Sequence, residues 1–334
     1  MKIIIIGSGI AGITFAEKFR SHAPNAEITL LTKEIEGYYS RPLLSHGFSR
    51  ENIEQTIILK TFDSLREKKI KINSGVEVSD IDRNAHRVTT KRSEDYESFE
   101  YDKLILALGS AALIPPPFRP YQELFFVLNS LGDLKKIRKF RQPMLELNHP
   151  PHWAIIGGGL IGCELASDLA VSGDQVTLFH GMDRLMERQL EEEDSSVLLT
   201  VLESSGIKVL LERAVQGFEK HNGKIGVFNQ NFDGVIVSCG FKPRIEVATK
   251  SGLEVNRGIT VNPYLQTSDE AIYALGDVAE LPNGKLYAFI MPIRSQATWL
   301  AGYLSNQDNT AWQPPAFNPK AKVHGFEATH PYIF

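Results

Sequence analysis

The chain has 334 residues, a length that suits two domains better than one. Apolar side chains make up 43% of the residues and charged side chains 23%, a balance typical of a globular protein. The formal net charge of −4 offers no basic surface for nucleic acid, and every apolar run is shorter than the ~18 residues of a membrane-spanning helix. We therefore expect a cytoplasmic protein without a nucleic-acid or membrane partner.

The first part of the chain, to about residue 110, alternates between predicted strands and helices. An apolar strand at 3–6 leads into a helix at 10–21, whose apolar residues recur on one side. Further strands are expected at 27–31, 71–78, 87–90 and 101–108. A run of three prolines at 115–117 then indicates a linker.

The pattern restarts after this linker. Strands are expected at 153–156, 175–179, 208–211 and 234–238. A third part follows, with an apolar strand at 272–275 and a helix predicted to begin at Pro292. The last stretch, 312–334, is rich in proline, and its pattern specifies no element.

Two glycine motifs lie 150 residues apart, each between an apolar strand and a helix. They read Gly-Ser-Gly-Ile-Ala-Gly at 7–12 and Gly-Gly-Gly-Leu-Ile-Gly at 157–162. In this context the first glycine makes a tight turn, the second lets the backbone approach a pyrophosphate, and the third lets the helix pack on the strand. The N-terminal end of the helix then holds the phosphates. Two motifs indicate two dinucleotides, which is typical of a protein that passes electrons between them.

The two cysteines indicate which redox chemistry is absent. Cys163 and Cys239 are far apart in the sequence, and neither lies in the first glycine-motif unit. No Cys-x-x-Cys occurs and the nine histidines are scattered, so no metal-binding spacing is present. We interpret both cysteines as small buried hydrophobic residues. The sequence predicts neither a dithiol relay nor a metal centre.

The order of the motifs resembles the flavoprotein reductases that have two dinucleotide-binding domains. The closest branch is similar to the NADH:rubredoxin and flavorubredoxin reductases. The resemblance covers about 300 positions and rests, besides the two glycine motifs, on Tyr-Ser-Arg-Pro-Leu-Leu-Ser at 39–45, Leu-Ile-Leu-Ala-Leu-Gly at 104–109, Glu164, Ser-Cys-Gly-Phe-Lys-Pro-Arg at 238–244, and Ile-Tyr-Ala-Leu-Gly-Asp at 272–277.

The resemblance implies an α/β fold of the glutathione-reductase type, with two Rossmann-like three-layer domains. A discontinuous domain, 1–112 with 241–310, is expected to bind FAD, and 113–240 to bind NAD(P)H. Residues 311–334 are expected to be a tail or the start of a C-terminal domain that is largely absent. Because that domain often forms a dimer surface in the family, we expect a monomer or a weak homodimer.

The resemblance also assigns residues to the cofactors. Asp277 is expected to accept a hydrogen bond from the flavin ribityl chain, although an acidic helix cap is the alternative. The helix that begins at Pro292 is expected to point its positive end at the flavin. The residues predicted to bind the two dinucleotides are Gly7, Gly9, Ala11, Gly12, Thr32, Lys33, Arg41, Pro42, Gly109, Gly157, Gly159, Gly162, His180, Gly240, Gly276, Asp277 and Pro292.

The loop at 39–46 is expected to hold the catalytic residue of the flavin site. In related ferredoxin reductases the position of His46 is often lysine, which pairs with the acid of the second glycine-motif helix, here Glu164. A His46–Glu164 pair that titrates near neutral pH would tune flavin N5 or the docking of the nicotinamide. The alternatives are a solvent-facing loop histidine and a structural Glu164.

The acid that usually binds the ribose hydroxyls is missing after both motifs. The first slot reads Thr32-Lys33, with Glu34 two residues late, and the second slot holds His180. Arg184 and Arg188 could bind a 2′-phosphate, but the basic signature of an NADPH site is incomplete. The branch resemblance favours NADH over NADPH.

We predict an FAD-dependent NAD(P)H:acceptor oxidoreductase. A hydride passes to FAD, and electrons then leave singly for a small redox protein such as rubredoxin. The basic run at 135–141 is either a docking stripe for an acidic partner or a solvated helix face. An NAD(P)H oxidase or quinone reductase on the same fold, and a nucleotide-binding module without turnover, remain open as alternatives.

Overall fold

The computed structural model describes residues 1–333 and divides the chain into two compact units. The first unit consists of Met1–Ser40, Ile58–Ala111 and Pro243–Phe317. The second unit consists of Arg41–Ile57, Ala112–Lys242 and the C-terminal stretch from Asn318. Among the described residues, no helix combines the length and the apolar character needed to cross a membrane.

The first unit is built around a five-stranded sheet in which every neighbouring pair is parallel. The strand order is β20-β9-β1-β2-β5, so that β1 lies at the centre. Its isoleucines are β-branched and suit a strand that is buried on both faces. The strands are β1 (Lys2–Ile6), β2 (Glu27–Thr32), β5 (Ile70–Ser74), β9 (Lys103–Leu106) and β20 (Ile272–Ala274).

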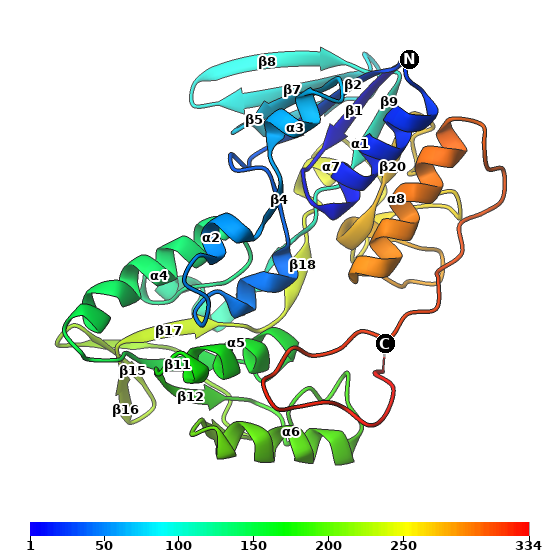
Figure 1. Cartoon of the computed structure of the whole chain (residues 1–334). Coiled ribbons are helices and arrows are strands. Elements are labelled where there is room, and N and C mark those ends of the chain that lie inside the picture. Colours follow the sequence, from blue (N-terminus) through cyan, green and yellow to red (C-terminus); the bar gives the residue numbers. More distant parts are fainter. Residues whose placement is uncertain (334) are drawn as a thin grey trace. The chain divides into compact units, whose positions relative to one another are not determined.

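Two long helices of the first unit, α1 (Ile10–His22) and α8 (Ile290–Leu304), lie side by side (Figure 1). Phe15 and Phe19 of α1 are fully buried, and their rings stack with centroids 5.5 Å apart. The helix predicted to begin at Pro292 begins two residues earlier, at Ile290. Its first turn carries neither a side-chain cap nor an acidic residue.

The remaining strands of the first unit include a three-stranded antiparallel sheet that the sequence pattern shows only in part. The single strand predicted at 71–78 is wrong, because Gly75 adopts a φ of +68° and separates β5 from β6. The strand β8 was not predicted, since its exposed polar residues carry no apolar pattern. The smaller elements are β3 (Tyr38–Tyr39), β4 (Ile58–Lys60), α3 (Phe62–Arg66), β6 (Glu77–Asp82), β7 (Arg87–Arg92), β8 (Asp95–Glu100), α7 (Glu246–Lys250), β19 (Ile259–Thr260), η3 (Gly276–Val278) and β21 (Ala279–Glu280).

The second unit contains a four-stranded parallel sheet with the order β13-β12-β11-β17. The helix α5 (Leu160–Val171) follows β11, and α6 (Glu192–Ser204) precedes β13. The sheet strands are β11 (His152–Ile156), β12 (Gln175–Phe179), β13 (Lys208–Leu210) and β17 (Gly234–Val237). A small antiparallel sheet, β14 (Glu219–His221), β15 (Lys224–Val227) and β16 (Gln230–Phe232), precedes β17. Two short strands, β10 (Ser110–Ala112) and β18 (Phe241–Pro243), pair where the chain passes between the units.

Other helices of the second unit are η1 (Arg41–His46), α2 (Ile53–Thr56), η2 (Pro116–Leu124) and α4 (Leu131–Glu146). The basic run at 135–141 lies in α4. Arg138 donates to Glu54, and Arg141 makes a two-point ion pair with Asp174, with N–O distances of 2.7 and 2.8 Å. Part of the run is therefore used within the fold, while Lys136 and Lys139 are exposed. Its role as a docking stripe stays a prediction.

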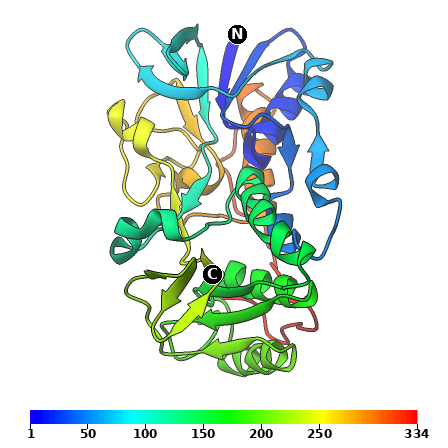
Figure 2. The same cartoon turned by 90° about the vertical axis from the view of Figure 1, so that its left-hand side faces the viewer.

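The C-terminal segment, defined here as residues 318–333, contains no helix or strand. It runs beside α5 and α6 of the same unit (Figures 1 and 2). Backbone amides of Lys322, His324 and Thr329 donate to the side chains of Glu164, Ser167 and Asp194. The segment is therefore fastened to the two helices by polar side chains that the helices direct toward it.

Candidate functional site

The first glycine motif forms a tight turn between β1 and α1. A Cβ on Gly7 would lie 2.1 Å from the carbonyl oxygen of Ala107, and one on Gly12 would lie 2.0 Å from that of Gly7. Neither position can hold a larger residue without a backbone shift. A Cβ on Gly9, in contrast, would meet no atom within 4 Å. Gly9 therefore presents bare backbone to open space, while Ala11 is buried inside α1.

The second glycine motif repeats this geometry between β11 and α5. A Cβ on Gly157 would lie 2.4 Å from the carbonyl oxygen of Ser238, and one on Gly162 would lie 1.9 Å from that of Gly157. Gly159 again has no atom within 4 Å of its would-be Cβ. Packing fills the first and third positions of both motifs, and only the second is left open for a ligand.

Both motif helices begin in a state that suits an anion. Gly9 and Gly159 are the N-cap residues of α1 and α5, and neither supplies a side-chain cap. The first turn of each helix carries no acidic residue. Their free N–H groups and positive helix ends are suited to a pyrophosphate group. The residues present therefore fit two dinucleotides.

The residues after β2 are tied to the first motif. The hydroxyls of Thr32 and Ser8 lie 2.8 Å apart, and the Glu34 backbone donates to Thr32 Oγ1. The Glu34 carboxylate accepts a hydrogen bond from Tyr39 at 2.9 Å. Lys33 points away into an exposed ion pair with Glu77. Of the residues in the predicted slot, Thr32 and Glu34 are therefore connected to the first glycine motif by hydrogen bonds, whereas Lys33 is not.

The Asp277 region lies at the carboxyl end of β20. Asp277 accepts a hydrogen bond from the Ser110 hydroxyl at 2.7 Å, and Gly276 has a φ of +72°. The Gly276 amide donates to Gln296 Oε1 of α8, while the buried Gln296 Nε2 has no hydrogen-bond partner among the described residues. Gly109, with a φ of +65°, accepts from the Arg244 amide. A polar ligand at this sheet edge would find an orphaned amide donor and an oriented carboxylate.

The residues after β12 differ from the predicted ribose slot. His180 is buried, and its Nδ1 accepts a hydrogen bond from the Gly158 amide at 3.0 Å. Because a backbone amide can only donate, His180 carries its proton on Nε2, which lies 3.1 Å from Glu187 Oε2. Arg184 donates to the carbonyls of Leu190 and Glu187. The carboxylate of Glu187 is thus joined to the second glycine motif through His180.

The loop residues Arg41 and Pro42 begin η1, which ends at His46. The Arg41 guanidinium donates to the carbonyl of Asn129 at 2.5 Å. The Ser45 hydroxyl, next to His46, donates to Glu164 Oε2 at 2.6 Å. The structure therefore brings the predicted loop to the second motif helix through Ser45.

Glu164 is fully buried in α5 and is surrounded by donors. Its Oε1 accepts hydrogen bonds from the backbone and the side chain of Lys322, at 2.9 and 2.8 Å. The predicted pairing was with His46, but the hydrogen-bonding partners of Glu164 are Ser45 and Lys322. A lysine thus reaches this acid from the C-terminal segment, a relation that sequence spacing does not reveal.

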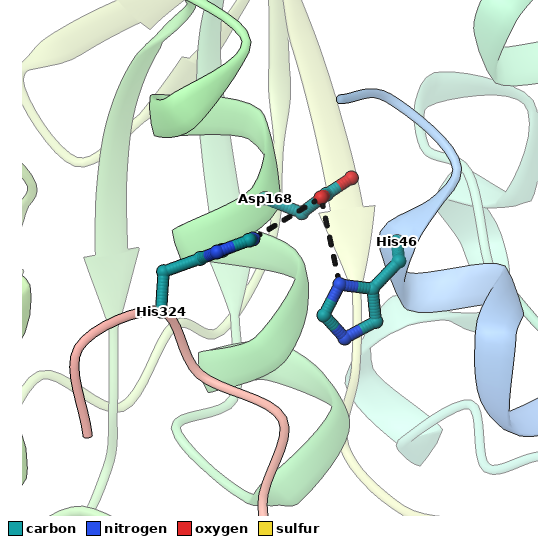
Figure 3. A group of neighbouring side chains, drawn as sticks. All are labelled: His46, Asp168 and His324. Atoms are coloured by element: carbon teal, nitrogen blue, oxygen red, sulfur yellow. Dashed lines mark ion pairs between the residues drawn. The ribbon is translucent and has the colours of Figure 1, made fainter. Parts of the chain in front are cut away.

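His46 faces a different acid, Asp168, one helical turn after Glu164. The distance between His46 Nδ1 and Asp168 Oδ1 is 3.7 Å, and His324 Nε2 lies 3.6 Å from the same oxygen (Figure 3). Burial lowers the pKa of His46, while the carboxylates of Asp168 and Glu164 oppose this shift. Sequence reasoning missed Asp168 and His324, and the only available signal was the i, i+4 spacing of Asp168 from Glu164.

The two cysteines are free thiols in the structure. Cys163 is fully buried, and burial raises its pKa far above the usual range. Burial also raises the pKa of Cys239 to about 11. Neither thiol is a nucleophile at neutral pH, because only the thiolate is reactive. Gly240, next to Cys239, has a φ of +106° and open space at its would-be Cβ.

Two open phosphate-binding turns on two parallel sheets define a protein that binds two dinucleotides, the class to which two-cofactor oxidoreductases belong. Comparison with known proteins refines this class. The model of the pyridine nucleotide-disulphide oxidoreductase family matches residues 1–298. The chain belongs to this family, and it is an oxidoreductase that uses FAD and a nicotinamide nucleotide.

The chain is also similar to individual proteins of known sequence or structure. The chain is 34% identical over 327 residues to the nitric oxide reductase FlRd-NAD(+) reductase of Escherichia coli O127:H6, covering 96% of this chain and 83% of the relative. It is 28% identical to the NADH:rubredoxin oxidoreductase of Clostridium acetobutylicum, with a TM-score of 0.77 over 97% of this chain and 80% of that one. The reduced CoADR-RHD of Bacillus anthracis shares the fold, with a TM-score of 0.88 at 22% identity. The match includes 97% of this chain but only 60% of the Bacillus anthracis protein.

Proposed function

We propose that this protein is an NADH-dependent reductase that passes electrons through FAD to a small one-electron carrier of the rubredoxin type. The observation that carries the proposal is the pair of open glycine turns, Gly9 and Gly159, each followed by an uncapped helix. The acceptor class is supported by the two relatives, one named an FlRd-NAD(+) reductase and the other an NADH:rubredoxin oxidoreductase.

The first unit is the proposed FAD domain and the second the proposed NADH domain. Bound FAD would accept a hydride from the nicotinamide and release electrons one at a time. Asp277, whose carboxylate is oriented by the Ser110 hydroxyl, would bind the flavin by accepting a hydrogen bond from its ribityl chain. The uncapped first turn of α8, which contains Pro292, supplies a positive helix end.

Glu164 has a positioning role in this proposal. Its buried carboxylate holds Ser45 on one oxygen and Lys322 on the other, which fixes the loop that ends at His46. Burial favours the neutral form of His46, so its imidazole can donate or accept a proton without carrying a fixed charge. Arg41 and Pro42 belong to the same loop and would contact the flavin.

The preference for NADH over NADPH rests on Glu187. A carboxylate beside the second glycine motif accepts hydrogen bonds from ribose hydroxyls and repels a 2′-phosphate. His180 anchors this carboxylate to the Gly158 amide. Arg184 is engaged by backbone carbonyls, and the highly exposed Arg188 lies 3.5 Å from Glu187 itself. The local charges therefore favour an unphosphorylated ribose.

Anaerobic titration of the purified yellow protein tests the proposed coenzyme. NADH is expected to bleach the flavin absorbance at about one equivalent, while the same amount of NADPH bleaches it slowly. Equal bleaching by both nucleotides would contradict the coenzyme assignment. A flavin that stays oxidised with both would contradict the reductase itself and favour a nucleotide-binding module.

Acceptor profiling then tests the partner. We expect fast NADH oxidation with oxidised rubredoxin and slow oxidation with O₂ or a soluble quinone. Faster turnover with O₂ or the quinone would instead identify an oxidase or quinone reductase.

Two further properties are proposed, a monomeric or weakly dimeric state and a cytoplasmic location. Gel filtration of the holoprotein tests the first, and fractionation of the native host tests the second.

A further inference from the structure

The cluster formed by His46, Asp168 and His324 has separations that hydrogen bonding does not explain. His46 Nδ1 lies 3.7 Å and His324 Nε2 lies 3.6 Å from Asp168 Oδ1. Both distances are longer than the 2.7–3.2 Å of an N–H···O hydrogen bond. Two ligands of one tetrahedral zinc ion lie roughly 3.3 Å apart, as follows from metal–ligand bonds of about 2.0–2.1 Å. The observed spacing is close to that value. The three ligand atoms all lie within 4.8 Å of one another.

The surroundings of Asp168 resemble the support of a metal ligand. Its Oδ2 accepts hydrogen bonds from the backbone amides of Phe48 and Ser49, at 2.8 and 3.2 Å. Its Oδ1 accepts one from the Ser49 hydroxyl and faces both histidines (Figure 3). Asp168 is fully buried, so its orientation is set by these bonds rather than by solvent. Such outer contacts orient metal-binding carboxylates.

His46 supplies the second observation. The residue is 7% exposed, and among the described residues its Nδ1 has only the 3.7 Å approach to Asp168. A buried imidazole nitrogen that lacks a hydrogen bond is costly unless something else binds it. The Nδ1 atom points at the space shared with Asp168 and His324.

From this geometry we infer that His46 Nδ1, Asp168 Oδ1 and His324 Nε2 form a binding site for a divalent zinc ion, with water as the fourth ligand. Two imidazoles and a carboxylate are borderline ligands that suit Zn²⁺. The two nearby carboxylates, Asp168 and Glu164, outnumber the single lysine Lys322, so the site attracts a cation. The His324 side chain is 43% exposed, which gives it room to close the remaining gap and leaves an open position for water.

The three ligands come from η1, α5 and the C-terminal segment, at positions 46, 168 and 324. Bound zinc would join the C-terminal segment to the helix that carries the second glycine motif. The scattered positions explain why no metal spacing is visible in the sequence. The zinc site neither requires nor excludes the proposed reductase activity.

Zinc content of the untagged, FAD-loaded protein tests the inference. The protein is stripped with a chelator, incubated with an equimolar zinc salt, passed through gel filtration and measured by mass spectrometry of the metal. We expect about one zinc per chain in the wild type. His324→Ala is expected to weaken zinc affinity by at least about 100-fold, because one of three protein ligands is lost. Flavin absorbance and the thermal midpoint confirm that the variant is folded.

His330→Ala is the matched control, since His330 is an equally exposed histidine of the same segment but pairs with Asp194 instead. It should retain one zinc. X-ray absorption at the zinc edge should show only nitrogen and oxygen ligands near 2.0 Å. The inference is overturned if the wild type retains no zinc, if both variants behave alike, or if sulfur ligands near 2.3 Å reveal binding at a cysteine.

Discussion

Individual glycines within one motif have opposite requirements. At Gly12 and Gly162 an added Cβ would lie 2.0 and 1.9 Å from a carbonyl oxygen, so packing alone forbids a larger residue. At Gly9 and Gly159 an added Cβ would meet nothing within 4 Å. Packing does not require glycine at these two open positions, and φ there is not in the left-handed region, so a ligand that approaches the backbone is the proposed reason. Within one motif, therefore, some glycines are required for packing and others leave space for a ligand.

Gly159→Ala and Gly162→Ala separate these two requirements experimentally. Gly159→Ala is expected to fold normally and bind NADH about tenfold more weakly, since its methyl group occupies the approach of the pyrophosphate. Gly162→Ala is expected to lower the free energy of unfolding by about 1–3 kcal/mol, as overpacked positions do. Urea unfolding and NADH titration of both variants measure the two effects. Equal losses of stability would refute this division.

Glu187 offers a second test at the residue scale. Glu187→Arg is expected to reduce the ratio of kcat/KM for NADH over NADPH by about 100-fold, because the repulsion of the 2′-phosphate becomes an attraction. Glu203→Arg, an identical charge change on an exposed residue of α6, is the control and should leave the ratio unchanged. Steady-state kinetics with both nucleotides decide the matter, and an unchanged ratio in Glu187→Arg would remove this residue from the ribose site.

Among the elements, α5 and α6 are unusual because they bury acidic side chains. Glu164 and Asp168 of α5 and Asp194 of α6 are at most 1% exposed. A buried carboxylate is unfavourable unless donors surround it. The partners of Glu164 and Asp194 include the C-terminal segment, and Asp168 is held by the turn after η1. These helices therefore determine where two otherwise irregular segments lie.

Asp194 tests the attachment of the C-terminal segment. Burial alone would raise its pKa, but hydrogen bonds from Thr329 and His330 lower it to about 2. Because the folded-state pKa lies below the ordinary value, the attachment is complete above about pH 4 and is lost as the pH falls toward 2. At neutral pH, Asp194→Ala should make residues 318–333 several-fold more sensitive to limited proteolysis.

Glu193→Ala is the control for this experiment, since Glu193 is exposed and lies in the same first turn of α6. It should leave the cleavage rate unchanged. Hydrogen exchange of the Thr329 amide between pH 5 and pH 2.5 measures the acid dependence. Protection that disappears near pH 5 would show that the carboxylate is not stabilised in the way proposed.

At the scale of the whole molecule, each unit is assembled from three separate stretches of chain. The second unit needs Arg41–Ile57 and the C-terminal segment in addition to its central stretch Ala112–Lys242. These outer stretches contribute much of the donor set for the buried acids of α5 and α6. The domains are therefore not separable by cutting the linkers alone.

A fragment that contains only 112–242 is accordingly expected to be unstable and to bind NADH weakly, although it includes the entire second glycine motif. The same fragment with Glu164→Gln, Asp168→Asn and Asp194→Asn should regain part of its stability, because neutral side chains are less costly to leave unpaired. Circular dichroism melting of both fragments measures this. A cooperative, NADH-binding wild-type fragment would refute the expectation.

The sequence by itself determined the two nucleotide-binding turns, the main parallel strands and the family, because these depend on local patterns of glycine and apolar residues. It also singled out Glu164, His46 and Asp277 through motif order, and their roles at the site stay predictions. It could not reveal that His180 joins Glu187 to the second glycine motif, since no regular element sets the distance between these two residues. Nor could it reveal that Lys322 and His324 approach α5.

Those relations were decided only by the tertiary structure. The buried carboxylates of α5 and α6 must find donors, and the chain supplies them from segments more than 100 residues away. The periodicity of apolar residues indicates which face of a helix is buried. It does not indicate which distant backbone amides donate hydrogen bonds to a buried carboxylate. Long-range polar pairing is fixed by the folded geometry, whereas the glycine turns are fixed by their own local sterics.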